Sequence, residues 1–280
     1  YLPTAAGAYS YANSIFVTDD AVYVAGADGA DGVVYWKNGA KIILAGPQEA
    51  TSSSGIFVTG NDVYVSGTAI ENATSLTTAC YWKNGIKYNL GEAGHNSGTK
   101  GIAVNGNDLY VIGMQYGTTE FFGYWKNGVP VDLNTGQYRA VPVSIFISGN
   151  DVYLSGYIKE NGNNKAAYWK NNTLISLHDP ALNGNSYAMS IYAENGVVYA
   201  AGREDDITTG RRVPVYWVNG IKKYLPVPPN TFEEARSVSV SGNDVYIAGS
   251  NSDYPVLWKN GERLELPHVA NSAAYSIFIK

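Results

Sequence analysis

Three observations predict an all-β repeat fold. The 280-residue chain has six tryptophans that recur at similar spacing, and five of them directly follow a tyrosine. A second tyrosine recurs upstream of each one, inside a short apolar segment. The turn sequences Gly-Asn-Asp and Asn-Gly separate the apolar segments, and no useful helical periodicity is present. The repeated tryptophans are Trp36, Trp82, Trp125, Trp169, Trp217 and Trp258.

Each repeat is predicted to contain four strands, which we call A to D. Its segments are short, rich in Val, Ile, Tyr and Trp, and bounded by turn residues, as strands are. In the second repeat, strand A covers 55–58, strand B 63–67, strand C 79–82 and strand D 86–90. Because Tyr81 and Trp82 are consecutive in strand C, their side chains point to opposite faces, so both faces of the sheet are apolar.

The repeats begin near residues 14, 55, 101, 144, 190 and 237. Four-stranded units of this length, repeated six times and apolar on both faces, are typical of β-propeller blades. The sequence therefore predicts an all-β, six-bladed β-propeller of four-stranded antiparallel blades, forming a single domain over residues 1–280.

The C-terminus carries one strand more than six blades need. Residues 275–280 repeat the strand A pattern, which predicts a surplus inner strand with a closing segment at 276–280. Three explanations remain open: a piece of a longer repeat array, closure of the ring by pairing with the first blade, or strand exchange with a neighbouring molecule. Our hypothesis is that the last strand completes the first blade and displaces residues 14–18. Self-association through residues 1–18 and 276–280 would follow.

The repeat also resembles a known kind of blade. Residues 144–156 with 168–171, and 237–249 with 258–261, carry Ser-Ile-Phe-Val-like inner strands, Gly-Asn-Asp turns and Tyr-Trp-Lys-Asn-Gly-like segments. These units resemble NHL-type blades, and still more a group of bacterial tandem-repeat propellers. The resemblance implies that strand A lines the central channel and that strand D is outermost. It covers nearly the whole chain and implies no function.

Composition excludes several classes of protein. Charged residues make up 15% and the net charge is −5 without a basic stripe, which argues against a nucleic-acid partner. A single cysteine excludes an intrachain disulfide or a cysteine zinc cluster, and no apolar run is long enough to span a membrane. We expect no cofactor and no metal. The chain shows no signal peptide, and we expect an extracellular or cell-surface location with that peptide removed.

The loops that differ between repeats predict where a site would lie. The A–B and C–D turns are nearly constant, whereas the B–C and D–A loops on the opposite face vary in length and chemistry. Charged and aromatic residues on that face are the candidate ligand-binding residues. They are Lys100, Tyr116, Arg139, Tyr157, Arg203, Asp205, Glu234 and Arg236. The loop over 203–212 holds the densest charge. We interpret it as a self-paired, solvated loop, and a clamp for an anionic or polyol ligand is the alternative.

These features lead to an expected function. The inner strands are mostly Ile, Phe, Val and Ser, which favours binding over catalysis, so no catalytic residue is assigned. We expect a non-enzymatic binding or scaffold propeller that presents the variable face to a carbohydrate or a protein. Two alternatives stay open: a self-assembling filament or surface-layer subunit that uses terminal strand exchange, and a lyase or lactonase-type enzyme with a site at the channel mouth.

Overall fold

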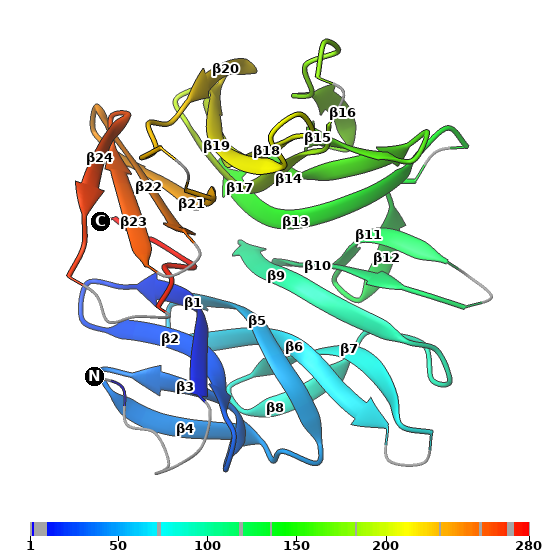
Figure 1. Cartoon of the computed structure of the whole chain (residues 1–280). Coiled ribbons are helices and arrows are strands. Elements are labelled where there is room, and N and C mark those ends of the chain that lie inside the picture. The colour runs from blue at the N-terminus through cyan, green and yellow to red at the C-terminus, as the bar shows by residue number, and fades with distance from the viewer. Residues whose placement is uncertain are drawn as a thin grey trace. The chain divides into compact units, whose positions relative to one another are not determined.

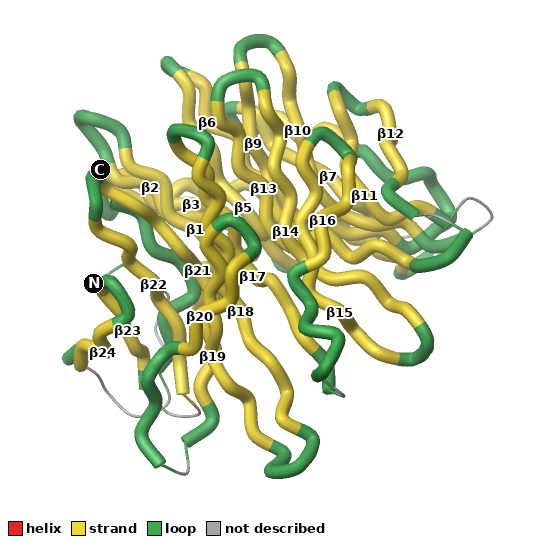
Figure 2. The backbone as a smooth tube through the Cα atoms, turned by 90° about the horizontal axis from the view of Figure 1, so that it is seen from above, coloured by secondary structure: helices red, strands yellow, loops and turns green. Residues whose placement is uncertain are grey.

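The computed structural model shows an all-β chain. The structure describes residues 2, 10–71, 74–117, 120–134, 136–182, 184–229, 231–251, 254–267 and 272–279. These residues form six four-stranded antiparallel sheets, in each of which the strands follow chain order, and Figure 2 shows only strands and loops. Within the described part of the chain, no helix is long and apolar enough to cross a membrane. The predicted fold class, six β-propeller blades of four antiparallel strands, is confirmed.

Three blades make up the first of two compact units, Tyr1–Leu133. The strands are labelled in Figure 1. Blade 1 contains β1 (Ser10–Val17), β2 (Val22–Asp28), β3 (Gly32–Lys37) and β4 (Ala40–Ala45). Blade 2 contains β5 (Ala50–Thr59), β6 (Asp62–Glu71), β7 (Leu76–Lys83) and β8 (Ile86–Asn89). Blade 3 contains β9 (Ser97–Asn105), β10 (Asp108–Gln115), β11 (Phe121–Lys126) and β12 (Val129–Asp132).

The second unit, Asn134–Lys280, holds the other three blades. Blade 4 contains β13 (Arg139–Ser148), β14 (Asp151–Glu160), β15 (Asn163–Lys170) and β16 (Thr173–Ser176). Blade 5 contains β17 (Ser186–Glu194), β18 (Val197–Asp206), β19 (Arg211–Val218) and β20 (Ile221–Tyr224). Blade 6 contains β21 (Glu233–Ser241), β22 (Asp244–Asn251), β23 (Pro255–Lys259) and β24 (Glu262–Glu265). The single domain over 1–280 stays a prediction.

The tight turns follow the predicted Asn-Gly signals. At the β3–β4 turn, Asn38 and Gly39 have φ values of 49° and 84°, and Asn84 and Gly85 repeat this geometry in blade 2. Asparagine and glycine adopt such positive φ at little cost, and two consecutive positive φ values give the turn that matches the twist of a hairpin. The turns are therefore encoded locally.

A bulge near the middle of the inner strand recurs in the blades and explains a repeated glycine. In blade 4 the register between β13 and β14 shifts between Pro142 and Ser144. Gly156 of β14 lies opposite this bulge, and a Cβ atom built there would lie 2.1 Å from the carbonyl oxygen of Val141. The bulged backbone therefore approaches so closely that only glycine fits.

We expect Gly156→Ala to lower the free energy of unfolding by about 1–3 kcal/mol, because the new methyl group must push the bulged strand away. The matched control is Gly136→Ala, since a Cβ atom at Gly136 meets nothing within 4 Å. Thermal unfolding of both variants measures the effect. Equal midpoints for the two variants would show that the close approach carries no constraint.

A polar cluster on the side of the constant turns also recurs. Lys83 Nζ lies 2.7 Å from Asp62 Oδ2 and 5.1 Å from the centre of the Tyr64 ring. Asn84 Nδ2 donates to Asp62 Oδ1 at 2.7 Å, and the Tyr64 hydroxyl donates to Asp62 Oδ2 at 3.4 Å. Lys83 is therefore held by a carboxylate and an aromatic ring. The other carboxylates with the same partners are Asp108, Asp151 and Asp244.

These clusters predict an acid-sensitive fold. The hydrogen bond from Lys83, followed by the one from Asn84, lowers the pKa of Asp62 below its ordinary value, and the other three aspartates behave alike. A lowered folded-state pKa stabilises the fold above the unfolded value of about 3.9, and the contribution is lost as the pH falls through the folded value. We expect the thermal midpoint to fall between about pH 5 and pH 2, and to fall less after Asp→Asn at all four positions. An unchanged pH profile in that variant would contradict the assignment.

The cores lie between neighbouring blades within each unit. One core joins Trp82 and Cys80 of blade 2 to Val33 and Ala45 of blade 1. Another joins Trp258 of blade 6 to residues of blade 5. All six tryptophans are at most 2% exposed. Cys80 is 0% exposed in the first of these cores, and this burial raises the pKa of its thiol to about 12.

The C-terminal segment differs from the prediction. Residues 272–279 are not in a strand, and Lys280 lies outside the described residues. The Ile277 and Ile279 N–H groups donate to the Ser237 and Ser239 hydroxyls at 3.2 and 3.3 Å. Val238 makes the same contact with Ser190 one blade earlier, at 3.1 Å. The segment thus lies beside β21 where the inner strand of a following blade would lie, but no strand of the second unit forms a ladder with it.

The hypothesis that this segment displaces residues 14–18 is wrong. Residues Ser10–Val17 form β1, which pairs with β2 from Ser10↔Asp28 to Val17↔Val22. The inner position of blade 1 is therefore filled by its own strand, because that strand is directly connected to β2 by a short turn. Tyr1 and residues 3–9 of the segment expected to associate lie outside the described residues.

Candidate functional site

Buried carboxylates occur near one end of blades 1, 5 and 6, each paired with a cation from the outer strand. Asp28 ends β2 and Glu204 lies near the end of β18, each five residues after the repeated tyrosine, and they are 0% and 3% exposed. Lys41 and Lys222, five residues after the repeated tryptophan, approach them at 3.0 Å. A buried charge is tolerated only when it is paired in this way.

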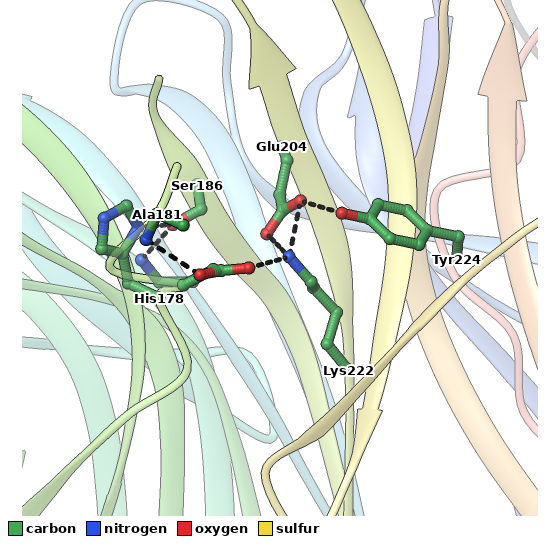
Figure 3. A network of polar contacts seen from close by, with 8 residues as sticks. His178, Ala181, Ser186, Glu204, Lys222 and Tyr224 are labelled. Carbon is green, nitrogen blue, oxygen red and sulfur yellow. Dashed lines mark hydrogen bonds and ion pairs between the residues drawn. The ribbon is translucent and has the colours of Figure 1, made fainter. Parts of the chain in front are cut away.

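The blade 5 pair belongs to a larger network (Figure 3). Lys222 Nζ also lies 3.1 Å from Asp179 Oδ2, and the Tyr224 hydroxyl donates to Glu204 at 3.3 Å. Burial alone would lower the pKa of Lys222, but hydrogen bonding with Tyr224 and the bonds that its ammonium group donates to Glu204 and Asp179 outweigh burial and raise it. The ammonium group is thus saturated by neighbours, which indicates a structural role.

A serine and a histidine also meet in this network. His178 Nδ1 lies 2.9 Å from Ser186 Oγ, and burial lowers the pKa of His178. Ser186 is fully buried and accepts the Ala166 N–H at 2.8 Å. Ser97 accepts the Ala79 N–H at the same distance in blade 3, where it starts the inner strand just as Ser186 does in blade 5. This position therefore holds neighbouring strands together, and the pair is not a nucleophile with its base.

A second cluster joins three arginines to one carboxylate. Arg203 Nη1 lies 2.8 Å from Glu234 Oε2, and Arg212 Nη1 lies 3.8 Å from the same oxygen. Arg236 Nη2 forms an ion pair with Glu234 Oε1, and Arg236 Nε donates to Ser250 Oγ at 3.0 Å. These cations come from β18, β19 and β21, so two blades build the cluster, which we call the arginine cluster.

Aromatic rings extend the arginine cluster on two sides. The Arg203 guanidinium lies 4.6 Å from the Tyr187 ring centre, and Tyr187 packs edge-on against Tyr157 at 5.0 Å. On the other side, the Arg236 guanidinium lies 4.5 Å from the centre of the Tyr275 ring. Such stacking holds guanidinium groups in fixed planes.

A cavity of about 340 Å³ opens beside this cluster in the second unit. Arg212 and Arg236 form its cationic wall, and Glu234 lies between them. The exposed rings of Phe232 and Tyr275 supply apolar surface. Its lining is completed by Glu233, Ser250, Asn251, Ser272 and Ala273. The cavity therefore combines cations, hydrogen-bonding groups and aromatic faces, which is typical of a ligand site.

The structure brings together five of the eight predicted site residues. Arg203, Glu234 and Arg236 share ion pairs, Asp205 lies 3.6 Å from Arg203 Nε, and Tyr157 joins them through Tyr187. The dense loop charge is thus partly self-paired, as the sequence interpretation held, although Arg212 remains 52% exposed.

The other three predicted residues lie elsewhere. Arg139 begins β13 and faces Lys159 of β14. Lys100 is an exposed residue of β9 in the first unit. Tyr116, in the same unit, donates its hydroxyl to Met114 Sδ at 3.4 Å and packs edge-on against Phe122. None of the three lines the cavity beside the arginine cluster.

Sequence reasoning missed several residues because it began the inner strand too late. The last repeat was predicted to begin at Ser237, whereas β21 begins at Glu233. Glu233, Glu234 and Arg236 are therefore inner-strand residues, which removes the argument that these strands lack titratable groups. Arg212 was recognised only as part of a charged loop. A comparison of equivalent repeat positions is the signal that would have found the buried carboxylates.

No cluster of three or more His, Cys, Asp or Glu side chains suited to a metal ion occurs among the described residues. Of the three histidines, His178 lies in the network of Figure 3, His95 lies in the first unit, and His268 is outside the described residues.

No protein-family model and no curated protein matches the chain. It is similar in structure to a GH43 endo-arabinanase from Bacillus licheniformis, with 12% identity, a TM-score of 0.41 and 94% of each chain covered. It is also similar to Trypanosoma rangeli sialidase, with 10% identity, a TM-score of 0.42, and 91% of this chain and 53% of that chain covered. The catalytic domain of a Coprinopsis cinerea GH62 α-L-arabinofuranosidase gives 10% identity, a TM-score of 0.33, and coverages of 81% and 88%.

These proteins carry the names of carbohydrate-active enzymes. The expectation of a non-enzymatic binding or scaffold propeller is corrected, because its premise that the inner strands lack titratable groups fails at Glu233, Glu234 and Arg236. The early start of β21 gives the physical reason why sequence reasoning reached that expectation. Identities of 10–12% carry no substrate or reaction over to this chain.

Proposed function

We propose that the chain is an enzyme that binds an acidic glycan beside the arginine cluster and cleaves it by β-elimination. This is the lyase alternative of the sequence analysis, placed at the cavity of the second unit. The observation that carries the proposal is the convergence of Arg203, Arg212 and Arg236 on the single carboxylate of Glu234.

The exposed arginine supplies the recognition of charge. Arg212 is 52% exposed and lies 3.8 Å from Glu234, beyond hydrogen-bonding distance, so its planar donors can take a second carboxylate. Arg236, at 27%, lies on the same cavity wall. A uronate sugar brings a carboxylate on a ring whose C–H faces suit the exposed rings of Phe232 and Tyr275.

The same wall favours proton abstraction next to that carboxylate. Paired with arginine, the carboxylate of a uronate accepts the negative charge that develops when the proton on the adjacent ring carbon is removed. Tyr275 is half-exposed beside Arg236 and is the candidate base. Acting as its phenolate, Tyr275 takes that proton on Oη, a double bond forms between the deprotonated carbon and the next ring carbon, and the bond from that next carbon to the glycosidic oxygen breaks. The departing glycosidic oxygen takes a proton from the Tyr275 hydroxyl formed in this step, which restores the phenolate.

Hydrolysis by two carboxylates fits this cavity less well. Such hydrolysis requires two accessible carboxyl groups on either side of the scissile bond. Glu233 lines the cavity but is 0% exposed, and Arg263 holds it at 3.1 Å through Nη2. Burial raises the pKa of Glu233, yet a group enclosed in this way cannot reach a glycosidic oxygen. Within the lining residues, Glu234 alone offers an accessible carboxylate.

The test is a comparison of polysaccharides. We expect the protein to degrade a uronate-containing polysaccharide such as polygalacturonate, alginate or hyaluronate, with the ultraviolet absorbance of an unsaturated product. Neutral arabinan and xylan are the controls. If either control polymer releases saturated reducing ends and no acidic polymer gives the absorbance, the reaction is hydrolysis and not elimination. If none of the polymers is degraded, the proposed reaction is wrong.

Three finer expectations accompany this proposal. An extracellular location suits an enzyme whose substrate is a polymer too large to enter a cell. The resemblance of the repeats to NHL-type blades and to bacterial tandem-repeat propellers remains a prediction. Self-association likewise stays a prediction, and light scattering of the full chain tests it.

A further inference from the structure

We propose that a second cavity in blade 6 binds the next sugar of the same glycan, an inference that rests on the proposed function. This cavity has a volume of about 210 Å³. Its wall includes Tyr254, Pro228, Pro255 and Arg263. A volume below the roughly 300–1,000 Å³ of sites for drug-sized ligands suits a single sugar ring.

The two cavities adjoin. Asn251, the last residue of β22, lines both of them. The buried ion pair between Glu233 and Arg263 connects their walls, since Glu233 lines the first cavity and Arg263 lines the second. A glycan held by Arg212 in the first cavity can therefore continue past Asn251 into the second.

Tyr254 gives the second cavity a fixed aromatic surface. The Tyr254 N–H donates to Asn251 Oδ1 at 2.6 Å, and the Asn251 N–H donates to the Tyr254 carbonyl at 3.0 Å. These two bonds hold the backbone at the end of the β22–β23 connection, while the side chain remains 38% exposed. An aromatic ring that is positioned before binding stacks on a sugar face at little entropic cost.

The second cavity differs from the first in charge. Arg263 is bonded to Glu233 through Nη2 and to Glu265 through Nη1, at 3.1 and 3.0 Å. Both ends of this guanidinium are therefore occupied, and Glu265 adds a carboxylate that is 81% exposed. This charge disfavours a second carboxylate, so the cavity selects the apolar face of the neighbouring sugar, with its own carboxylate turned to solvent.

Binding as a function of glycan length tests the inference. The probes are galacturonic acid, glucuronic acid and their oligosaccharides up to the tetramer, with affinities measured by calorimetry. We expect each disaccharide that binds to do so more tightly than its monosaccharide. Tyr254→Ala should weaken disaccharide binding by about 2- to 12-fold and leave the monosaccharide affinity unchanged. Tyr254→Phe keeps the ring and should keep the gain.

The outcomes separate this inference from the proposed function. If monosaccharide binding depends on Arg212 but lengthening the glycan adds nothing, or if Tyr254→Ala weakens both lengths equally, the second subsite is wrong and the first site stands. If no uronate of any length binds, the proposed function fails together with the subsite.

Discussion

Arg212→Ala is expected to lower kcat/KM for an acidic polysaccharide by roughly 10- to 150-fold. The estimate corresponds to the loss of about 1.5–3 kcal/mol from one hydrogen-bonded charge contact with the substrate carboxylate. Arg212 is 52% exposed and lies at the outer edge of the arginine cluster, so the fold should tolerate its replacement. Steady-state kinetics on the most rapidly degraded polymer measure the effect.

Arg211→Ala is the matched control. Arg211 precedes Arg212 in β19, so the two side chains point to opposite faces of the sheet, and the substitution removes the same formal charge. We expect Arg211→Ala to stay within about 2-fold of the parent. Equal losses in both variants would show that only the overall charge matters and would contradict a specific contact at Arg212.

Trp82→Ala is expected to lower the free energy of unfolding by about 3–5 kcal/mol. Trp82 is 1% exposed and packs in the core between blades 1 and 2. Neighbouring side chains cannot move in to fill the space of the lost indole, because the strands around it are packed on both faces. A cavity therefore remains. A loss of this size is a large share of the roughly 5–15 kcal/mol that stabilises a typical protein.

Tyr88→Ala in the same blade provides the comparison. Tyr88 is 42% exposed and stacks on Tyr81 at 5.0 Å, so its removal should cost about 1 kcal/mol. Denaturant unfolding of both variants gives the difference. If Trp82→Ala were as stable as Tyr88→Ala, the repeated tryptophan would not be the centre of the blade core.

The architecture could be predicted because its signals are local and repeated six times. Asn38-Gly39 adopts the turn that its residue types favour, and Trp82 is buried where the repeat places it. The ends of the strands were harder to predict from the sequence. Nothing in the sequence 233–236 marks it as strand, and β21 extends there because pairing with β22 continues up to Asn251. Tertiary pairing thus decided where the inner strand begins.

The candidate site was only partly predictable. Arg203 and Arg236 were found because they are charges in variable segments, but their common partner Glu234 depends on how blades 5 and 6 pack. The separation of Arg212 and Glu234 along the chain does not indicate that Arg212 also lies beside this carboxylate. Conversely, Lys100 and Tyr116 also stand in variable segments of the sequence, but both belong to the first unit, whereas the arginine cluster belongs to the second.

The most direct test of the account is a crystal structure of the Tyr275→Phe variant with a uronate tetrasaccharide. This variant lacks the proposed base but keeps the ring beside Arg236, so the substrate should remain uncleaved. The account predicts a sugar carboxylate within hydrogen-bonding distance of the Arg212 or Arg236 guanidinium, with the next ring over Tyr254. A glycan bound elsewhere, or one whose carboxylates all face solvent, would contradict it.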